Sequence, residues 1–79
     1  MKARIIVTLK KEVLDPQGKA VESSIVKMGF NGVKNVRVGK VFDLDIEGSK
    51  DKALENLSSL SKKLLSNPVI EDVQIELGN

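Results

Sequence analysis

The stretch Leu14-Asp15-Pro16-Gln17-Gly18 marks the point where the first extended segment gives way to the first helix. The carboxylate of Asp15 can accept hydrogen bonds from the unpaired N–H groups of a first helical turn, so it is a good N-cap. Pro16 suits the first helical position, where its fixed φ is already helical and its missing N–H is not needed. Gly18 costs a helix about 1 kcal/mol relative to alanine. A tolerated glycine is the commoner reason for such a stretch, and the alternative is that another part of the chain approaches Gly18 closely.

The segments on either side of this stretch have opposite periodicities. Lys2–Leu9 alternates as a strand does, and one of its sides carries Ala3, Ile5, Val7 and Leu9. Pro16–Met28 has the helical period, with an apolar row formed by Val21, Ile25 and Met28. Gly29 fits the left-handed position that ends such a helix. The first half of the chain is therefore predicted to be a strand followed by a helix.

Two more strands, at residues 33–38 and 41–47, are predicted to form a hairpin around Gly39-Lys40. A second helix begins after the cap Ser49, and its apolar row is formed by Ala53, Leu57, Leu60 and Leu64. Asn67-Pro68 ends this helix, because the residue before proline is pushed out of the helical region. Residues 69–77 then close the chain as a strand.

The hairpin register follows from which side chains share a face. Pairing Val38 with Phe42 keeps the apolar residues of both strands on one side of the sheet, whereas pairing Val38 with Val41 does not. The preferred register also sets Arg37 opposite Asp43, which is a favourable cross-strand pair.

The element order β-α-β-β-α-β predicts an α+β protein with a ferredoxin-like fold. Right-handed crossovers give a four-stranded antiparallel sheet with both helices on one face. With 79 residues, the chain is expected to form one domain spanning residues 1–79. A chain of this size buries only about 60–65% of its unfolded surface, so association with further copies is a common remedy.

The composition argues against several classes of function. The chain contains no histidine and no cysteine, so unaided acid–base or thiolate catalysis is not expected. A net charge of +2 and only two aromatic residues, Phe30 and Phe42, argue against nucleic-acid binding. No apolar run reaches the roughly 18 residues that span a bilayer. We expect a cytoplasmic protein without a signal peptide.

Two constellations resemble ligand sites and are better explained otherwise. Asp43, Asp45 and Glu47 share one face of a strand and could offer oxygen ligands to a divalent cation. They climb the strand about 6.5–7 Å apart instead of converging, so a solvated, ion-paired face is the better interpretation. Gly39-Lys40 lacks the upstream glycine and following hydroxyl of a phosphate loop. We predict no metal site and no catalytic residue in this chain.

Three short motifs occur in a fixed order: D-P-Q-G at 15–18, R-x-G-K at 37–40 and N-P-x-I-E at 67–71. Together they resemble the PurS family over nearly the whole chain. PurS proteins are the small third component of the multi-subunit phosphoribosylformylglycinamidine synthase of purine biosynthesis. The resemblance implies a chain without an active site, which bridges a glutaminase subunit and a large ATP-dependent synthetase subunit and supports ammonia transfer between them.

The resemblance also implies that this chain binds no cofactor, and that the partner subunits use ATP, Mg and glutamine. The chain itself is expected to form a homodimer or a homotetramer. We hypothesise that the partner-binding residues are found at loops and element ends, where the chemistry exceeds what folding needs. They are Asp15, Pro16, Gln17, Gly18, Arg37, Gly39, Lys40, Asn67 and Pro68. For Asp15, Gly39 and Pro68 a purely structural role is an equally good explanation.

An alternative of the same fold is an amino-acid-binding regulatory module, which binds its ligand between paired domains and associates with a biosynthetic enzyme. An RNA-binding ferredoxin-like domain is disfavoured because the central strands lack stacking rings. Co-purification separates the first two: the PurS resemblance requires glutamine-dependent synthetase activity to arise only when three components are mixed.

Overall fold

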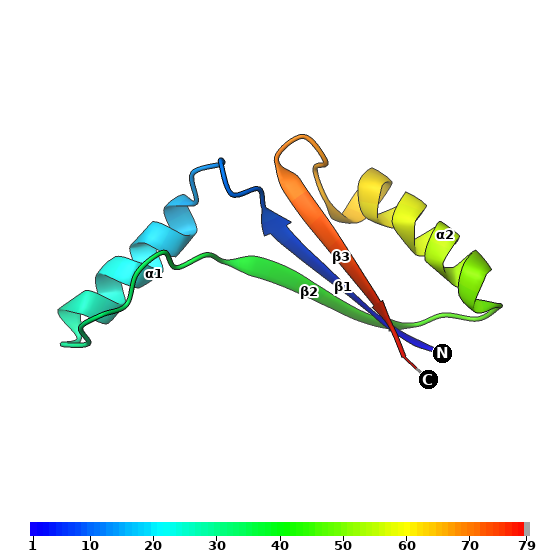
Figure 1. Ribbon diagram of the computed structural model, residues 1–79, viewed down its shortest axis with the longest axis horizontal. Helices are drawn as coiled ribbons and strands as arrows, with labels where there is room; N and C mark the ends of the chain where they lie inside the picture. The colour runs from blue at the N-terminus through cyan, green and yellow to red at the C-terminus, as the bar shows by residue number, and fades with distance from the viewer. Residues whose placement is uncertain (79) are drawn as a thin grey trace.

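A computed structural model describes residues 1–78, and Figure 1 shows how its elements are arranged. In chain order they are β1 (Lys2–Leu9), α1 (Pro16–Lys27), β2 (Gly39–Asp45), α2 (Lys50–Leu60), a π-helical turn η1 (Ser61–Leu65) and β3 (Glu71–Leu77). The predicted α+β class is confirmed. β2 begins and ends two residues earlier than expected, and β3 begins two residues later.

The described residues form a three-stranded sheet in the order β2-β1-β3, with both pairs antiparallel. The central β1 places Ile5 opposite Phe42 on one side and Ile75 on the other. Because side chains alternate along a strand, these three share the face that α2 covers. Arg4 precedes Ile5 in the strand, so its side chain lies on the opposite, open face of the sheet.

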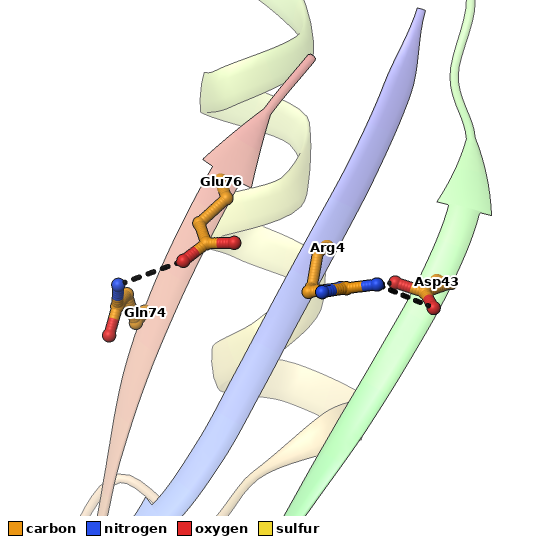
Figure 2. A network of polar contacts seen from close by, with 4 residues as sticks. All are labelled: Arg4, Asp43, Gln74 and Glu76. Carbon is orange, nitrogen blue, oxygen red and sulfur yellow. Dashed lines mark hydrogen bonds and ion pairs between the residues drawn. The ribbon is translucent and has the colours of Figure 1, made fainter.

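The core lies between β1 and α2. Ala3, Ile5 and Val7 are buried from the sheet side, and Ala53 and Leu57 are buried from the helix side. Each fully buried Ile or Leu contributes about 1.5–3 kcal/mol. Seen from the open face, α2 lies behind β3 and β1 (Figure 2), so the core occupies only part of the sheet.

The buried row of the second helix differs from the predicted one after Leu57. Ser61 is buried in place of Leu60, whereas Leu60 is 38% exposed and Leu64 is 74% exposed. Ser61 follows Leu57 by one regular turn of α2, because its N–H donates to Leu57 O, and the wider π turn η1 begins only there, where the N–H of Ser66 donates to Ser61 O. The hydroxyl of Ser61 donates to Leu57 O at 2.7 Å, which satisfies this buried polar group within the helix.

The predicted hairpin is wrong. Residues 33–38 lie outside the sheet, and Gly39 is the first residue of β2, opposite Thr8. The two pairings considered for Val38 therefore do not occur within the chain. Arg37 does not lie opposite Asp43, because β1 takes that position and Arg4 pairs with Asp43 instead. A four-stranded ferredoxin-like sheet is not formed by residues 1–78 alone.

The expectation that both helices cover one face of the sheet is right for α2 and wrong for α1. In Figure 1, α1 projects from the end of the sheet, far from α2. The Cα radius of gyration is 15.8 Å and the longest extent is 49 Å, whereas a compact chain of this length has a radius of gyration near 12 Å. The molecule is therefore extended, and the apolar row of α1 finds no sheet to pack on.

Candidate functional site

Asp15 is the centre of the predicted partner-binding region. Asp15 is only 4% exposed, and its two carboxylate oxygens accept hydrogen bonds from different segments of the chain. Oδ1 accepts from the N–H of Gly18 in the first turn of α1, and Oδ2 accepts from the N–H of Val38, both at 2.8 Å. The donors Val38 and Gly18 hold the pKa of the Asp15 carboxyl below its usual value. The predicted N-cap is confirmed, and it also ties α1 to the segment before β2.

Gly18 is explained by a close approach, the less common of the two alternatives. A Cβ atom at this position would overlap the carbonyl oxygen of Val36. One turn later, Glu22 accepts a hydrogen bond from the N–H of Val36 at 3.1 Å. The backbone of this segment therefore lies directly against α1, in contact that only glycine permits.

Arg37 holds the loop between β1 and α1. Its Nη2 donates to the carbonyl oxygens of Lys10 and Val13, each at 2.9 Å. The Lys10 carbonyl also accepts a hydrogen bond from the N–H of Val13 at 2.9 Å, so Arg37 adds a second bond to a turn that the backbone already closes. Arg37 was predicted as a partner-contacting residue, and the structure gives it a clear internal role.

We call the resulting unit the α1 arm, which consists of α1, residues 10–15 and residues 35–38. It contains five of the nine predicted residues: Asp15, Pro16, Gln17, Gly18 and Arg37. Pro16 and Gln17 are exposed on the first turn of α1. A hollow of about 430 Å³ lies between α1 and residues 35–37, and Lys11, Lys19 and Arg37 contribute to its lining.

The other four predicted residues lie near the same end of the sheet. Gly39 begins β2, and a Cβ there would come within 2.8 Å of Val7 O, so its role is structural. Lys40, paired with Val7 in the ladder, is exposed. The carbonyl of Asn67 accepts from the N–H groups of Ile70 and Glu71, which shapes the turn into β3. Pro68 is exposed on that turn.

A backbone hydrogen bond joins the α1 arm to the turn before β3, which contains Asn67 and Pro68. The N–H of Lys10, at the start of the α1 arm, donates to Ile70 O in the turn before β3 at 2.9 Å. In an antiparallel sheet, the end of β1 lies beside the beginnings of both neighbours. The structure therefore brings the nine candidate residues to one end of the molecule, which the sequence analysis did not predict.

Two members of the acidic row on the open face, Asp43 and Asp45, are ion-paired, and Figure 2 shows the pair formed by Arg4 and Asp43. Arg4 Nε and Nη2 donate to Asp43 at 2.8 and 3.3 Å, and Lys2 Nζ reaches Asp45 at 3.2 Å. The bond with Arg4 lowers the pKa of Asp43. Within residues 1–78, no three His, Cys, Asp or Glu side chains are grouped so that they could share a metal ion.

Sequence reasoning missed Glu22 and Arg4. Glu22 shares a helix face with Gly18, but its bond to Val36 joins residues 14 positions apart that no local pattern connects. Arg4 was not considered as a partner of Asp43, which the sequence analysis paired with Arg37 instead. In the part of the chain described here, neither helix has the length and apolar character needed to cross a membrane.

Comparison with known proteins gives a consistent result. The sequence model of the family PurS, described as phosphoribosylformylglycinamidine (FGAM) synthase, matches residues 2–79. The phosphoribosylformylglycinamidine synthase subunit PurS of Bacillus subtilis is 46% identical over 77 residues, which are 96% of this chain and 90% of that protein. The corresponding subunit of Methanocaldococcus jannaschii is 42% identical over 77 residues, covering 96% and 93% of the two chains.

Solved structures agree over the same length. B. subtilis PurS in its C2 crystal form has a TM-score of 0.90 at 41% identity, covering 99% of this chain and 98% of that chain. A chain in the structure of PurLQS from Thermotoga maritima has a TM-score of 0.86 at 34% identity, covering 95% and 93%. Agreement over 99% of the chain includes the α1 arm, so a relative shares its projecting position.

Proposed function

The chain belongs to the PurS family, and from this premise we propose that it is the small, non-catalytic subunit of phosphoribosylformylglycinamidine synthase in purine biosynthesis. In this role it bridges a glutaminase subunit and a large ATP-dependent synthetase subunit. The bridge keeps the two partners together, so that ammonia released from glutamine reaches the synthetase without escaping. The family match over residues 2–79 is the observation that carries the proposal.

The chemistry of the chain supports a contact role. The three groups with shifted pKa values, Arg4, Asp15 and Asp43, are engaged in hydrogen bonds within the chain. A catalytic acid or base has a shifted pKa together with access to a substrate. Here the shifts come from hydrogen bonds within the chain, which fits a contact role. In the proposal, the partner subunits supply the reactive groups and use ATP, Mg and glutamine. The proposal places the complex in the cytoplasm, with this chain as a homodimer or homotetramer.

The partner-binding surface can be narrowed by removing residues that already have internal roles. Asp15, Gly18, Arg37, Gly39 and Asn67 each hold or fit another part of the chain. The remaining four predicted residues are exposed: Pro16, Gln17, Lys40 and Pro68. We take these four as the contact residues, and we take the five internal ones as the framework that presents them.

Reconstitution with three purified subunits tests the function. Glutamine-dependent formation of formylglycinamidine ribonucleotide is expected only when this chain is present, whereas the synthetase subunit retains turnover with free ammonia. Full glutamine-dependent turnover without this chain would contradict the bridging role. Turnover of either substrate by the chain alone would contradict its non-catalytic character.

A pair of lysine variants tests the contact surface. Lys40→Ala is expected to weaken complex formation, measured by analytical ultracentrifugation of the three components. Lys63→Ala is the matched control, because Lys63 is also exposed but lies in η1. Equal binding by both variants, with unchanged circular dichroism, removes Lys40 from the surface.

A further inference from the structure

Four asparagines lie within residues 1–78, and their surroundings differ. They are Asn31, Asn35, Asn56 and Asn67. An asparagine loses its side-chain amide when the backbone nitrogen of the following residue attacks the side-chain carbonyl carbon and closes a five-membered ring. This reaction needs a following N–H that is present, free of hydrogen bonds and open to approach. The structure decides which of the four asparagines meets these conditions.

Asn35 and Asn56 are each followed by an N–H that is already in use. The N–H of Val36 donates to Glu22 Oε1 at 3.1 Å, the bond that ties this segment to α1. Leu57 is buried inside α2, where its N–H belongs to the helical hydrogen-bond ladder. Neither nitrogen can attack the preceding side chain without breaking a bond of the fold.

Asn67 is followed by a residue that cannot act as the nucleophile. The next residue is Pro68, whose ring nitrogen carries no hydrogen. The Asn67 side chain is also engaged, because its Oδ1 accepts a hydrogen bond from the N–H of Val69 at 3.1 Å. Three of the four positions are therefore protected.

Asn31 differs from the other three in each of these respects. It lies with Gly32 in the exposed connection that follows α1, outside any helix or strand. Within residues 1–78, the N–H of Gly32 donates to no other backbone group. Gly32 has a φ of 86°, and apart from its chain neighbours no atom lies within 4 Å of the place where a Cβ would stand. Because glycine has no side chain, the approach of its nitrogen to the Asn31 amide is open.

We propose that Asn31 is a site of spontaneous deamidation, with Gly32 supplying the nucleophile. The Gly32 nitrogen forms a bond to Asn31 Cγ, the bond from Cγ to Nδ2 breaks, and the proton of the Gly32 nitrogen leaves with Nδ2 as ammonia. Water then opens the resulting succinimide ring. Opening at Cγ gives aspartate at this position. Opening at the main-chain carbonyl gives isoaspartate, in which the main chain runs through the former side chain.

Either product places a new carboxylate in the stretch between Lys27 and Lys34, at the far end of α1. The formal net charge of +2 falls by one. A negative charge near the carbonyl end of a helix is unfavourable. Isoaspartate also lengthens the main chain between α1 and residues 35–38, which bond Asp15 and Glu22 in the α1 arm. The modification therefore changes both charge and spacing at this end of the arm.

Peptide mapping of the purified chain after incubation at mildly alkaline pH tests this site. The test needs no other subunit, so its outcome is independent of the proposed enzymatic role. Trypsin cleaves after lysine and arginine, so it releases residues 28–34 as a peptide whose only asparagine is Asn31. Asn35 and Asn56 fall in separate peptides, and fragment ions locate any change within the peptide that contains Asn67. A sample digested without incubation corrects for reaction during the digest.

The expected product is the peptide of residues 28–34 with the amide NH replaced by O, as a mixture of aspartate and isoaspartate, while Asn35, Asn56 and Asn67 stay intact. Because the fold leaves the site open, its rate in the folded chain should lie within about tenfold of the rate in the synthetic peptide. A slower rate, or faster modification of another asparagine, overturns the proposal. Aspartate without isoaspartate overturns the role of Gly32, since direct hydrolysis of the amide gives aspartate alone.

Two substitutions at this position provide matched controls. Asn31→Asp should co-migrate, on isoelectric focusing, with the acidic band that the native chain develops during incubation. Asn31→Gln should develop no such band over the same time, because a glutamine has to close a larger ring that forms more slowly. An acidic band that accumulates in Asn31→Gln at the native rate would place the reaction elsewhere and refute the assignment.

Discussion

Substituting Gly18 by alanine separates local helix propensity from the close approach of Val36. In an open helix the change would stabilise the protein by about 1 kcal/mol. Here the new methyl group meets the Val36 carbonyl, which belongs to the backbone and cannot rotate away. Overpacking costs typically about 1–3 kcal/mol, and a backbone obstacle justifies the upper part of that range. We therefore expect a net loss of about 1–2 kcal/mol, with the opposite sign to the propensity effect.

Thermal unfolding by circular dichroism at one fixed protein concentration measures this change, because association makes the midpoint depend on concentration. Each kcal/mol lowers Tm by about 4–8 °C in a chain of this size. Ser23→Ala is the matched control, since Ser23 is exposed in the same helix. A higher Tm for Gly18→Ala than for the native chain would refute the close-approach argument. Hydrogen exchange at Val36 and Val38 should quicken in the variant and remain slow in the control.

Three further predictions concern the core, the N-cap and the loop. Leu57→Ala should cost about 2–5 kcal/mol in urea unfolding, whereas Leu54→Ala should cost little because Leu54 is half exposed. The lowered pKa of Asp15 means that its stabilisation is complete above the unfolded-state pKa of about 3.9 and is lost as pH falls through the lower folded-state pKa. Asp15→Asn should therefore lower Tm at pH 7 and flatten the decline of Tm below pH 4; an unchanged acid profile would show that the cap does not titrate with unfolding. Arg37→Ala should cost about 1 kcal/mol and quicken proteolysis of the loop at residues 10–13, and equal proteolysis rates would contradict its anchoring role.

Local signals in the sequence were sufficient for most of the elements. Asp15-Pro16 predicted the start of α1 and Ser49 that of α2, because caps act within a few residues of the helix they begin. Gly29, at φ 93°, has the left-handed conformation expected at the end of α1. The alternation in Lys2–Leu9 gave the buried face of β1 correctly, since one side of that strand faces the core.

The errors arose where the contacts of a segment are distant in the sequence. Residues 33–38 have the composition of a strand, and pattern alone cannot say which edge, or whose, such a strand joins. Leu60 and Ser61 both follow Leu57 at regular helical spacings, and the apolar pattern favoured Leu60, whereas the structure buries Ser61. The candidate partner-binding residues stay a prediction, and Glu22 lies beside them through a contact with Val36 that no local rule describes.

The α1 arm is attached to the rest of the chain at two places. Asp15 at the start of α1 bonds Val38 just before β2, and Arg37 of the same segment bonds the carbonyls of Lys10 and Val13 in the loop that follows β1. A force applied at the free tip of the helix cannot be absorbed by one flexible joint, because two attachment points must move together. A molecule bound at the tip of α1 therefore acts on β1 and β2 together. Movement of the helix tip would change how these two strands are aligned.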